Sequence, residues 1–485
     1  MITNKKTKIV ATLGPACSTR EIIKDMIDAG VNVFRINFSH ADYEDVKEKI
    51  NLIRGLNDEF GYTTAILGDL QGPKLRVGVM EDGVIVNDGD LITFTTADDI
   101  LGTAKKVFMK YKNFPNDVNP GEKILLDDGK LIFEIVETDK KTEVVAKVLQ
   151  GGELKSKKGV NLPNTKISLP ALTEKDIADA IFAINQNVDW IALSFVKTPE
   201  DLQDLQELIA KHSEYKIPII AKIEMPEALV NIDKIIAYCD GLMVARGDLG
   251  VELPAHEVPL VQKELIRRAK TARIPVIVAT QMMETMITSL TPTRAEVNDV
   301  ANSVMDGADA VMLSGETATG NYPVQVIQQM TQILKAVEDS PLIVVPQNTP
   351  QIKTNRFITK IVCHHAAIMA NGINAKAICT LTNSGYTAFQ ISAWRPQSHI
   401  LVFTSNKRIL TSLNLLWGVK TFFYDSSGST DDTVSDLNEI AKNNGYVTKG
   451  DFLVTLSAMP LADKGMVNTL RVSEIELFQS YQMIM

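Results

Sequence analysis

Two short segments carry the residues whose types and spacing are best suited to chemistry. Residues 219–224 and 241–250 each begin as an apolar run and end on charged residues, as parallel strands buried on both faces do where they reach a site. Because side chains alternate along a strand, Lys222 and Glu224 are expected to point to the same side. One strand therefore supplies a cation and a carboxylate together, and the second run adds another carboxylate at Asp248.

This combination predicts a site for a divalent metal and a phosphate. Glu224 and Asp248 form an oxygen pair that suits Mg²⁺, which proteins usually hold with one or two carboxylates while water and substrate oxygens complete the octahedron. Gly247 allows a ligand to approach the backbone closely. Lys222 has two interpretations, a Schiff-base lysine or a charge that stabilises a phosphoryl group in transfer. The metal pair and the basic residues together favour the second.

Polar residues at two earlier positions add to this set. Arg35 can hold a phosphate or a carboxylate in bidentate fashion. It alternates with Asn37 and Ser39, so the three share one face of a predicted strand. The sequence further predicts an oxygen cage for a second, monovalent cation, formed by Asn37, Ser39, Asp69 and the carbonyl of Leu70.

Strands whose ends meet at one edge are needed to bring these residues together. Eight apolar runs, most of them separated by helical segments, are predicted to be strands: 8–15, 31–40, 63–70, 190–196, 218–224, 241–246, 275–281 and 308–316. Eight is the count of a closed (β/α)₈ barrel, whose active site lies at the carboxyl ends of the strands. Thr280 and Glu316 fall at such ends too. An open doubly wound sheet is the alternative fold.

The alternation of predicted barrel strands and helices is interrupted twice, which predicts three domains. Between about 71 and 170, short β-branched runs alternate with Asp-Gly and Gly-Gly turns, as in a small antiparallel β domain. After Ser340-Pro341 the pattern is α/β again, with strands predicted at 376–381, 399–404, 419–424 and 451–456. We therefore expect a barrel domain (1–70 and 171–340), an inserted β domain (71–170) and a C-terminal α/β domain (341–485).

Composition excludes several classes of protein. The 485 residues are 45% hydrophobic and 22% charged with a net charge of −9, which argues against a nucleic-acid partner. No apolar run approaches the roughly 18 residues of a membrane span, and no signal segment is apparent, so a cytoplasmic location is expected. The four cysteines form no C-x-x-C pair. Residues 363–365 (Cys-His-His) are not expected to bind metal, and the Met-rich run 281–286 is expected to pack in the core.

Seven motifs in one order resemble those of the pyruvate kinase family, bacterial type, nearly end to end. They are TKIVATLGP (7–15), FRINFSH (34–40), KGVNLP (158–163), AKIE (221–224), ARGDLG (245–250), ATQM (279–282) and SGETA (314–318). The resemblance implies a (β/α)₈ TIM barrel, an inserted small β-barrel lid domain, a C-terminal α/β effector and oligomerisation domain, and a homotetramer.

The resemblance also implies substrates and roles. Phosphoenolpyruvate would bind Mg²⁺ (or Mn²⁺) on Glu224 and Asp248, with its carboxylate against Gly247 and Asp248. Lys222 and Arg35 would stabilise the phosphoryl group as it passes to ADP, giving pyruvate and ATP. Thr280 would lie close to the enolate, and Glu316 would support its protonation. The implied nucleotide-binding residues are Asn37, Phe38, Ser39, His40, Arg76 and Lys158.

One departure from the family bears on monovalent cations. Members that need K⁺ usually carry Thr-Lys after the aspartate that corresponds to Asp69, and Glu at the position of Lys74. This chain has Leu70-Gln71 and Lys74 instead. The Lys74 ammonium could supply the charge that K⁺ otherwise brings. We therefore expect activity without added K⁺.

A regulatory site is expected in the C-terminal domain. The segment Thr382, Asn383, Ser384, Gly385, Tyr386 and Thr387 opens a helix after a strand, where backbone N–H groups and hydroxyls can bind phosphate. It resembles the effector loop of the family, which implies a phosphorylated metabolite as effector, whereas residues 456–460 depart from the glycine-containing pattern common there. Two other functions remain open at this point: a metal-dependent aldolase or mutase, and a non-catalytic metabolite sensor.

Overall fold

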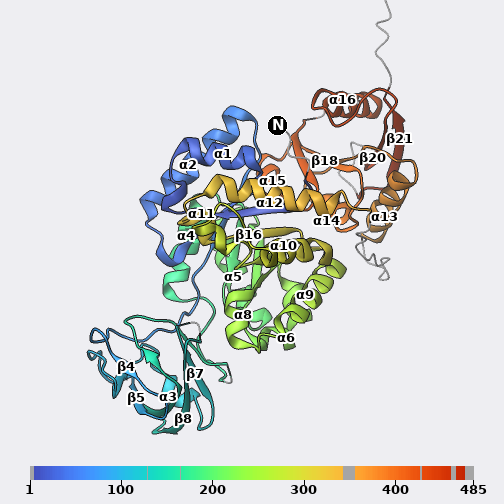
Figure 1. Ribbon diagram of the computed structural model, residues 1–485. Helices are drawn as coiled ribbons and strands as arrows, with labels where there is room; N and C mark the ends of the chain where they lie inside the picture. Colours follow the sequence, from blue (N-terminus) through green and yellow to red (C-terminus); the bar gives the residue numbers. More distant parts are fainter. Residues whose placement is uncertain are drawn as a thin grey trace, which may run out of the picture. The chain divides into compact units, whose positions relative to one another are not determined.

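A closed barrel of eight parallel strands organises the chain in the computed structural model (Figure 1), which describes residues 5–127, 129–163, 165–341, 356–425, 429–459 and 466–475. The strand order around the barrel is β1-β16-β15-β14-β13-β12-β3-β2. The bounds are β1 Lys8–Thr12, β2 Val33–Asn37, β3 Ala65–Asp69, β12 Trp190–Leu193, β13 Ile219–Ile223, β14 Gly241–Ala245, β15 Val276–Ala279 and β16 Ala310–Leu313. The barrel prediction is confirmed, and the open-sheet alternative is wrong.

The barrel strands are shorter than the apolar runs that predict them. Most of their residues are buried, because the sheet is covered on both faces. Glu224 and Thr280 each follow the last strand residue directly, whereas Asp248 and Glu316 lie in the first turns of helices α8 and α11. The assignment of residues 246 and 314–316 to strands is therefore wrong.

The chain packs as two compact units that share the strands of the barrel. One comprises Met1–Gly68, Gln186–Trp190 and Ile266–Met485, and the other comprises Asp69–Asn185 and Ile191–Leu265. The helices that accompany the barrel strands are α1 Arg20–Ala29, α2 Tyr43–Phe60, α4 Glu174–Asn185, α5 Pro199–His212, α6 Pro226–Val230, α7 Ile232–Tyr238, α8 Arg246–Glu252, α9 Val258–Ala272, α10 Arg294–Asp306, α11 Gly315–Ala318 and α12 Pro323–Glu338, with 3₁₀ turns η1 Pro15–Cys17, η2 Phe38–His40 and η3 Glu284–Ile287. No helix in the described ranges is both long and apolar enough to span a bilayer.

The inserted β domain belongs to the second unit. Its six-stranded sheet has the order β11-β7-β8-β9-β5-β6, beside a two-stranded sheet β10-β4. The bounds are β4 Ile85–Val86, β5 Leu91–Thr95, β6 Lys106–Phe108, α3 Phe114–Asp117, β7 Lys123–Leu126, β8 Leu131–Thr138, β9 Glu143–Gln150, β10 Gly152–Glu153 and β11 Val160–Asn161. The core includes Phe94 and Phe133, whose ring centroids lie 5.5 Å apart in an edge-to-face arrangement. The domain is not wholly antiparallel as predicted, because β5 and β6 pair in parallel. Asp128, part of a predicted turn, lies outside the described residues.

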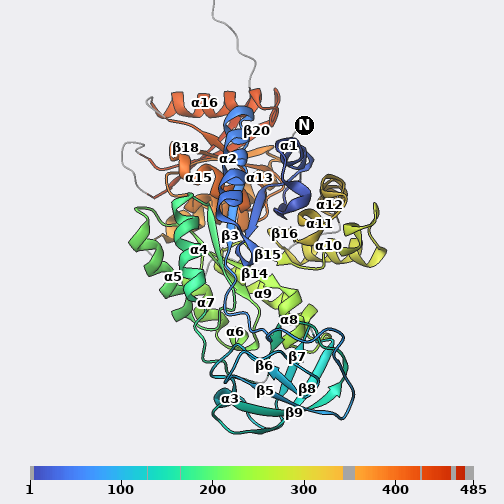
Figure 2. The same ribbon diagram turned by 90° about the vertical axis from the view of Figure 1, so that its left-hand side faces the viewer.

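The C-terminal sheet belongs to the first unit and has the order β19-β18-β17-β20-β21. The bounds are α13 Phe357–Gly372, β17 Ala377–Leu381, α14 Tyr386–Ala393, β18 His399–Thr404, α15 Lys407–Ser412, η4 Leu413–Leu415, β19 Val419–Phe423, α16 Thr430–Asn443, β20 Phe452–Ser457 and β21 Thr469–Glu474. Alternate residues of β17 pack on α13 and on α16, which lie on opposite faces (Figures 1 and 2). The four predicted strands are present. Strand β21 was not predicted, because it is half exposed and contains no apolar run. The predicted domain boundary at 341 adjoins residues 342–355, which lie outside the described ranges.

Candidate active site

The ammonium of Lys222 is held by three oxygen groups in the second unit. Its Nζ donates to Ser194 Oγ at 2.6 Å and lies 3.0 Å from Glu224 Oε1 and 3.1 Å from Asp69 Oδ1. These partners sit at the carboxyl ends of the neighbouring strands β3, β12 and β13. Only 9% of Lys222 is exposed. The predicted shared face of Lys222 and Glu224 is confirmed, and the cation is buried among three oxygen groups.

Glu224 is a buried carboxylate with the carboxylates of Asp248 and Asp69 near it. It is 1% exposed, and its Oε2 accepts a hydrogen bond from the Phe195 N–H at 2.7 Å. Burial raises the pKa of its carboxyl, and the carboxylates of Asp248 and Asp69 raise it further, against the effect of Lys222. A divalent cation would offset this repulsion, and the donors are all oxygen, as Mg²⁺ requires.

The described part of the chain does not by itself form a complete metal cage. Among the described residues, no group of three or more His, Cys, Asp or Glu side chains is gathered for metal binding. Mg²⁺ commonly keeps several positions for water and for substrate oxygens. Two carboxylates therefore fit a metal that binds together with a phosphorylated substrate.

Ser194 is the residue that sequence reasoning missed. Its hydroxyl accepts from Lys222 and donates to the carbonyl of Leu70 at 2.7 Å. It follows a buried strand, in the same way as the residues that were singled out, but a lone serine at such a place carries no distinctive signal. Gly72 makes the arrangement possible: it has φ +72°, and a Cβ there would lie 2.9 Å from the Ser194 Cβ and 2.6 Å from the Phe195 ring.

Replacing Ser194 by alanine is expected to lower kcat about tenfold or more, because a hydrogen bond to a charged group is worth roughly 1.5–3 kcal/mol and Lys222 would lose one of its three anchors. Steady-state kinetics of the catalysed reaction would measure this loss. Ser398→Ala is the matched control, since Ser398 is also buried and also donates to a backbone carbonyl, that of Ala375 at 2.6 Å. Equal kcat values in the two variants would remove Ser194 from the site.

A cavity in the second unit lies beside this cluster. It encloses about 510 Å³ of empty space, part of it open to solvent, and its wall includes Lys74, Asn161, Lys197, Asp248 and Glu252. Burial raises the pKa of Glu252 to about 7. Its Oε1 accepts from the Asn161 amide at 2.8 Å, while its Oε2 is buried without a hydrogen-bond partner. Lys74 thus shares a cavity wall with Asp248, and its role as a replacement for K⁺ stays a prediction.

The predicted catalytic residues Arg35, Thr280 and Glu316 lie in the first unit, as does Asn37. Arg35 donates from Nη1 to Thr12 Oγ1 at 3.1 Å. Thr280 has φ +71°, and its hydroxyl donates to the Ala279 carbonyl at 2.6 Å. Glu316 is buried, which raises the pKa of its carboxyl, and it accepts from the N–H groups of Met283 and Ser314. Asn37 Oδ1 accepts from the Ser39 N–H at 3.2 Å, which caps the turn η2.

The remaining nucleotide-binding predictions fall on both units. The Arg76 guanidinium donates to the Lys157 carbonyl at 3.0 Å, and Lys158 pairs with Asp127 at 2.9 Å. Phe38 is fully buried, so contact with a nucleotide there would have to come from its backbone. His40 lies in η2. Of the predicted monovalent-cation cage, the Leu70 carbonyl accepts from Ser194 and Asp69 pairs with Lys222, so both groups already have protein partners.

The predicted effector loop is a tight turn before α14. Gly385 has φ +79° and donates its N–H to Thr382 Oγ1 at 3.1 Å. The Ser384 hydroxyl accepts from the Tyr386 N–H, the Thr387 hydroxyl accepts from Thr380 Oγ1, and the Asn383 carbonyl accepts from Asn406. Pro460, in the segment that departs from the family pattern, lies outside the described residues.

Two segments that were expected to be structural can be placed. Cys363 is buried in the C-terminal core, and His364 stacks on Trp394 at 4.0 Å. Met282, Met283 and Met286 are completely buried, so the packing prediction for the Met-rich segment is confirmed.

Comparisons with known proteins agree on one family. Residues 4–327 match the family model described as pyruvate kinase, barrel domain, and residues 360–473 match the one described as pyruvate kinase, alpha/beta domain. The chain is 42% identical over 475 residues to a pyruvate kinase of Geobacillus stearothermophilus, covering 97% of this chain and 80% of the relative. It is 40% identical to that of Corynebacterium glutamicum, covering 97% of each. The crystal structure of a pyruvate kinase from Cryptosporidium parvum superimposes with a TM-score of 0.90 at 34% identity, covering 97% of this chain and 96% of that one.

Proposed function

Since this chain belongs to the pyruvate kinase family and is a phosphotransferase, we propose that it transfers the phosphoryl group of phosphoenolpyruvate to ADP at the Lys222 and Glu224 cluster. The observation that carries the assignment of this site is the ammonium of Lys222, fixed between two buried carboxylates and the Ser194 hydroxyl. A preorganised charge of this kind stabilises a transferring phosphoryl group without reorganisation at the moment of reaction.

In the proposed reaction the bridging P–O bond of phosphoenolpyruvate breaks as a terminal oxygen of ADP bonds to phosphorus. Lys222 and Arg35 bind the phosphoryl oxygens and stabilise the charge that spreads over them. The enolate that leaves takes a proton at its terminal carbon and becomes pyruvate. Thr280 is assigned to the neighbourhood of the enolate, and Glu316 holds the loop there through its bonds to the Met283 and Ser314 N–H groups.

Mg²⁺ (or Mn²⁺) is the proposed cofactor, held by Glu224 and Asp248. When bound, it neutralises charge on the substrate oxygens that complete its coordination shell. Asp248 and Gly247 lie in the first turn of α8. The start of a helix favours negative charge, so the backbone at Gly247 and Asp248 is assigned to the substrate carboxylate.

The nucleotide is assigned to the cavity that Lys74, Asn161 and Lys197 line, with Arg76 and Lys158 of the inserted β domain and residues 37–40 as further contacts. This cavity is partly open to solvent, and two lysines stand in its wall. Lysine and arginine side chains suit the phosphate chain of ADP.

Independence of K⁺ is proposed from Lys74. The Lys74→Glu variant is expected to lose at least about tenfold in kcat when K⁺ is replaced by tetramethylammonium and to regain it with K⁺, whereas the native chain turns over equally in both salts. Lys74→Gln separates loss of the ammonium from gain of a carboxylate. If the ion dependence of Lys74→Glu equals that of the native chain, the proposal is wrong.

Regulation and assembly are proposed from the family. The loop 382–387 is assigned to a phosphorylated-metabolite effector, which is expected to change the phosphoenolpyruvate concentration at half-saturation. A homotetramer is proposed, and light scattering after size exclusion would measure its mass. A cytoplasmic location is proposed on the same basis.

The assay that tests the function is formation of pyruvate from phosphoenolpyruvate, ADP and Mg²⁺, run in parallel with K⁺ and with tetramethylammonium. Turnover in both salts supports the kinase and its independence of K⁺. Turnover with K⁺ alone supports the kinase assignment and contradicts the proposal that Lys74 replaces K⁺. No turnover in either salt, even after sugar phosphates are added, would reject the kinase and leave the aldolase or mutase and the sensor.

A further inference from the structure

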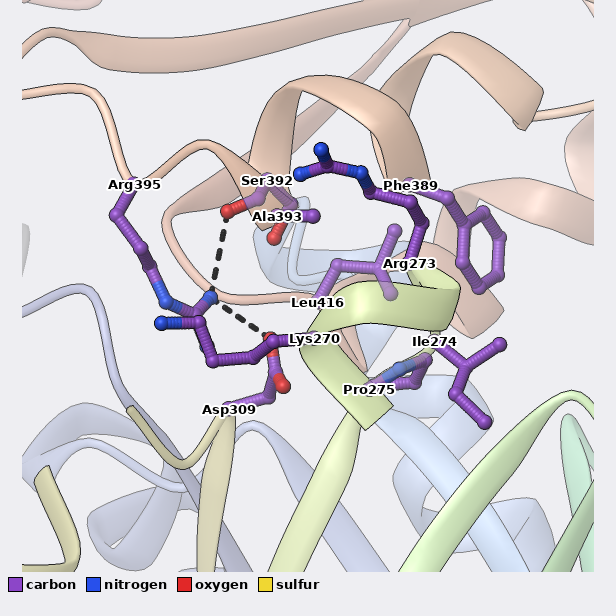
Figure 3. Close-up of a pocket in the computed structure, with 10 residues that line it drawn as sticks. All are labelled: Lys270, Arg273, Ile274, Pro275, Asp309, Phe389, Ser392, Ala393, Arg395 and Leu416. Atoms are coloured by element: carbon purple, nitrogen blue, oxygen red, sulfur yellow. Dashed lines mark hydrogen bonds and ion pairs between the residues drawn. The ribbon is translucent and has the colours of Figure 1, made fainter. Parts of the chain in front are cut away.

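A second cavity lies in the first unit, against α14, the helix that begins at the predicted effector loop. It has about 230 Å³ of empty space, partly open to solvent, and ten residues line it (Figure 3). Three of these side chains are cationic and one is anionic. They are Lys270 in the last turn of α9, Arg273 just after it, Arg395 just after α14, and Asp309 just before β16. Part of that space is open solvent and the enclosed part is narrow, so the occupant must be small.

The single acid of this cavity is already engaged by protein groups. Asp309 Oδ1 accepts from Arg395 Nη1 at 2.8 Å, drawn as a dashed line in Figure 3, and Oδ2 accepts from the Val276 N–H at 2.9 Å. Burial, together with the charges of Arg395 and Arg273, lowers the pKa of Lys270 to about 8, while Asp309 acts in the opposite direction. The two arginines therefore disfavour the charged form of Lys270, and a bound anion would favour it.

The two arginines are fixed in place. Arg395 also donates from Nη2 to the Gly307 carbonyl at 2.7 Å and is 5% exposed, and its Nε is buried without a hydrogen-bond partner. The Arg273 guanidinium lies 3.7 Å from the centre of the Trp394 ring. Both residues have positive φ angles, +63° for Arg273 and +48° for Arg395. Groups held in this way lose little entropy when they bind a ligand.

We propose that this cavity binds a tetrahedral oxyanion, the phosphate group of inorganic phosphate or of a small phosphorylated metabolite. Arginine and lysine around a small, partly buried cavity match the charge and the hydrogen-bonding geometry of such a group. The site is separate from the loop 382–387, none of whose residues lines the cavity. It is independent of the proposed function, because it concerns binding alone.

Calorimetric titration of the full chain with inorganic phosphate, and separately with glycerol 3-phosphate at equal ionic strength set with chloride, tests the proposal. Lys270→Met is expected to raise the dissociation constant about tenfold or more, the usual cost of losing a charge-assisted hydrogen bond. Lys335→Met is the matched control, because Lys335 is an exposed lysine in the last turn of α12. Tighter binding of glycerol 3-phosphate would identify a metabolite as the occupant, and equal binding would identify the free anion.

Phosphate can also bind at the proposed active site, so Arg35→Met is titrated in parallel. Binding that survives in Arg35→Met and weakens in Lys270→Met supports the cavity site. Binding that is lost in Arg35→Met and unchanged in Lys270→Met would overturn it. Arg273→Met repeats the test if Lys270→Met does not fold, with the same two outcomes. None of these readouts depends on turnover, so failure here leaves the kinase assignment untouched.

Discussion

Replacing Lys222 by methionine is expected to lower kcat for pyruvate formation by about 10³-fold, with a smaller change in the KM for phosphoenolpyruvate. Removal of one preorganised charge from an active site typically costs about 10²–10³ in kcat, and cations on a transferring phosphoryl group contribute up to about 10⁵. Lys222 belongs at the upper part of the first range, because Ser194, Glu224 and Asp69 hold its ammonium in one position.

The same substitution has a second, structural readout. Without the ammonium, the buried carboxylates of Glu224 and Asp69 lie near each other with less compensating charge, so the thermal midpoint of Lys222→Met is expected to fall. Added Mg²⁺ is expected to raise the thermal midpoint of the variant part of the way back to the native value, because a bound divalent cation would compensate for the negative charge of these carboxylates. Lys335→Met, which removes an exposed lysine in the last turn of α12, is the control for both measurements. A kcat within threefold of the native value would refute the role of Lys222 in transfer.

Glu224→Gln is expected to weaken Mg²⁺ binding by at least about 10²-fold, since changes even to the partners of metal ligands cost 10–100-fold in affinity. The substitution preserves shape, and the amide oxygen can still accept from the Phe195 N–H. The loss is therefore one of charge rather than of packing. Titration of the metal by calorimetry, in the presence of phosphoenolpyruvate, measures it directly.

Asp189→Asn is the matched control for Glu224→Gln. Asp189 is also a buried carboxylate, and it accepts from the Ile66 N–H at 2.7 Å and pairs with Arg54 at 2.9 Å. Its loss is expected to lower stability and to leave metal affinity unchanged. If Glu224→Gln binds Mg²⁺ as tightly as Asp189→Asn does, the metal belongs elsewhere.

The sequence by itself determined those features that depend on local periodicity. Alternation along a strand placed Lys222 and Glu224 on one face, and the structure joins them at 3.0 Å. Eight apolar runs predicted eight barrel strands, because both faces of a parallel sheet are buried and the resulting hydrophobic run is visible in the sequence. The order of the seven motifs was sufficient to identify the family.

Only the tertiary structure decided which residues meet across strands. Ser194 reaches both Lys222 and the Leu70 carbonyl because β12 lies between β13 and β3 in the barrel, an order that no local pattern carries. The cavity of Lys270, Arg273 and Arg395 is likewise invisible in the sequence, since Arg395 lies more than a hundred residues beyond the other two. Hydrophobic periodicity records whether a residue is buried. It does not record its neighbour, which is set by strand order and by the packing of distant segments.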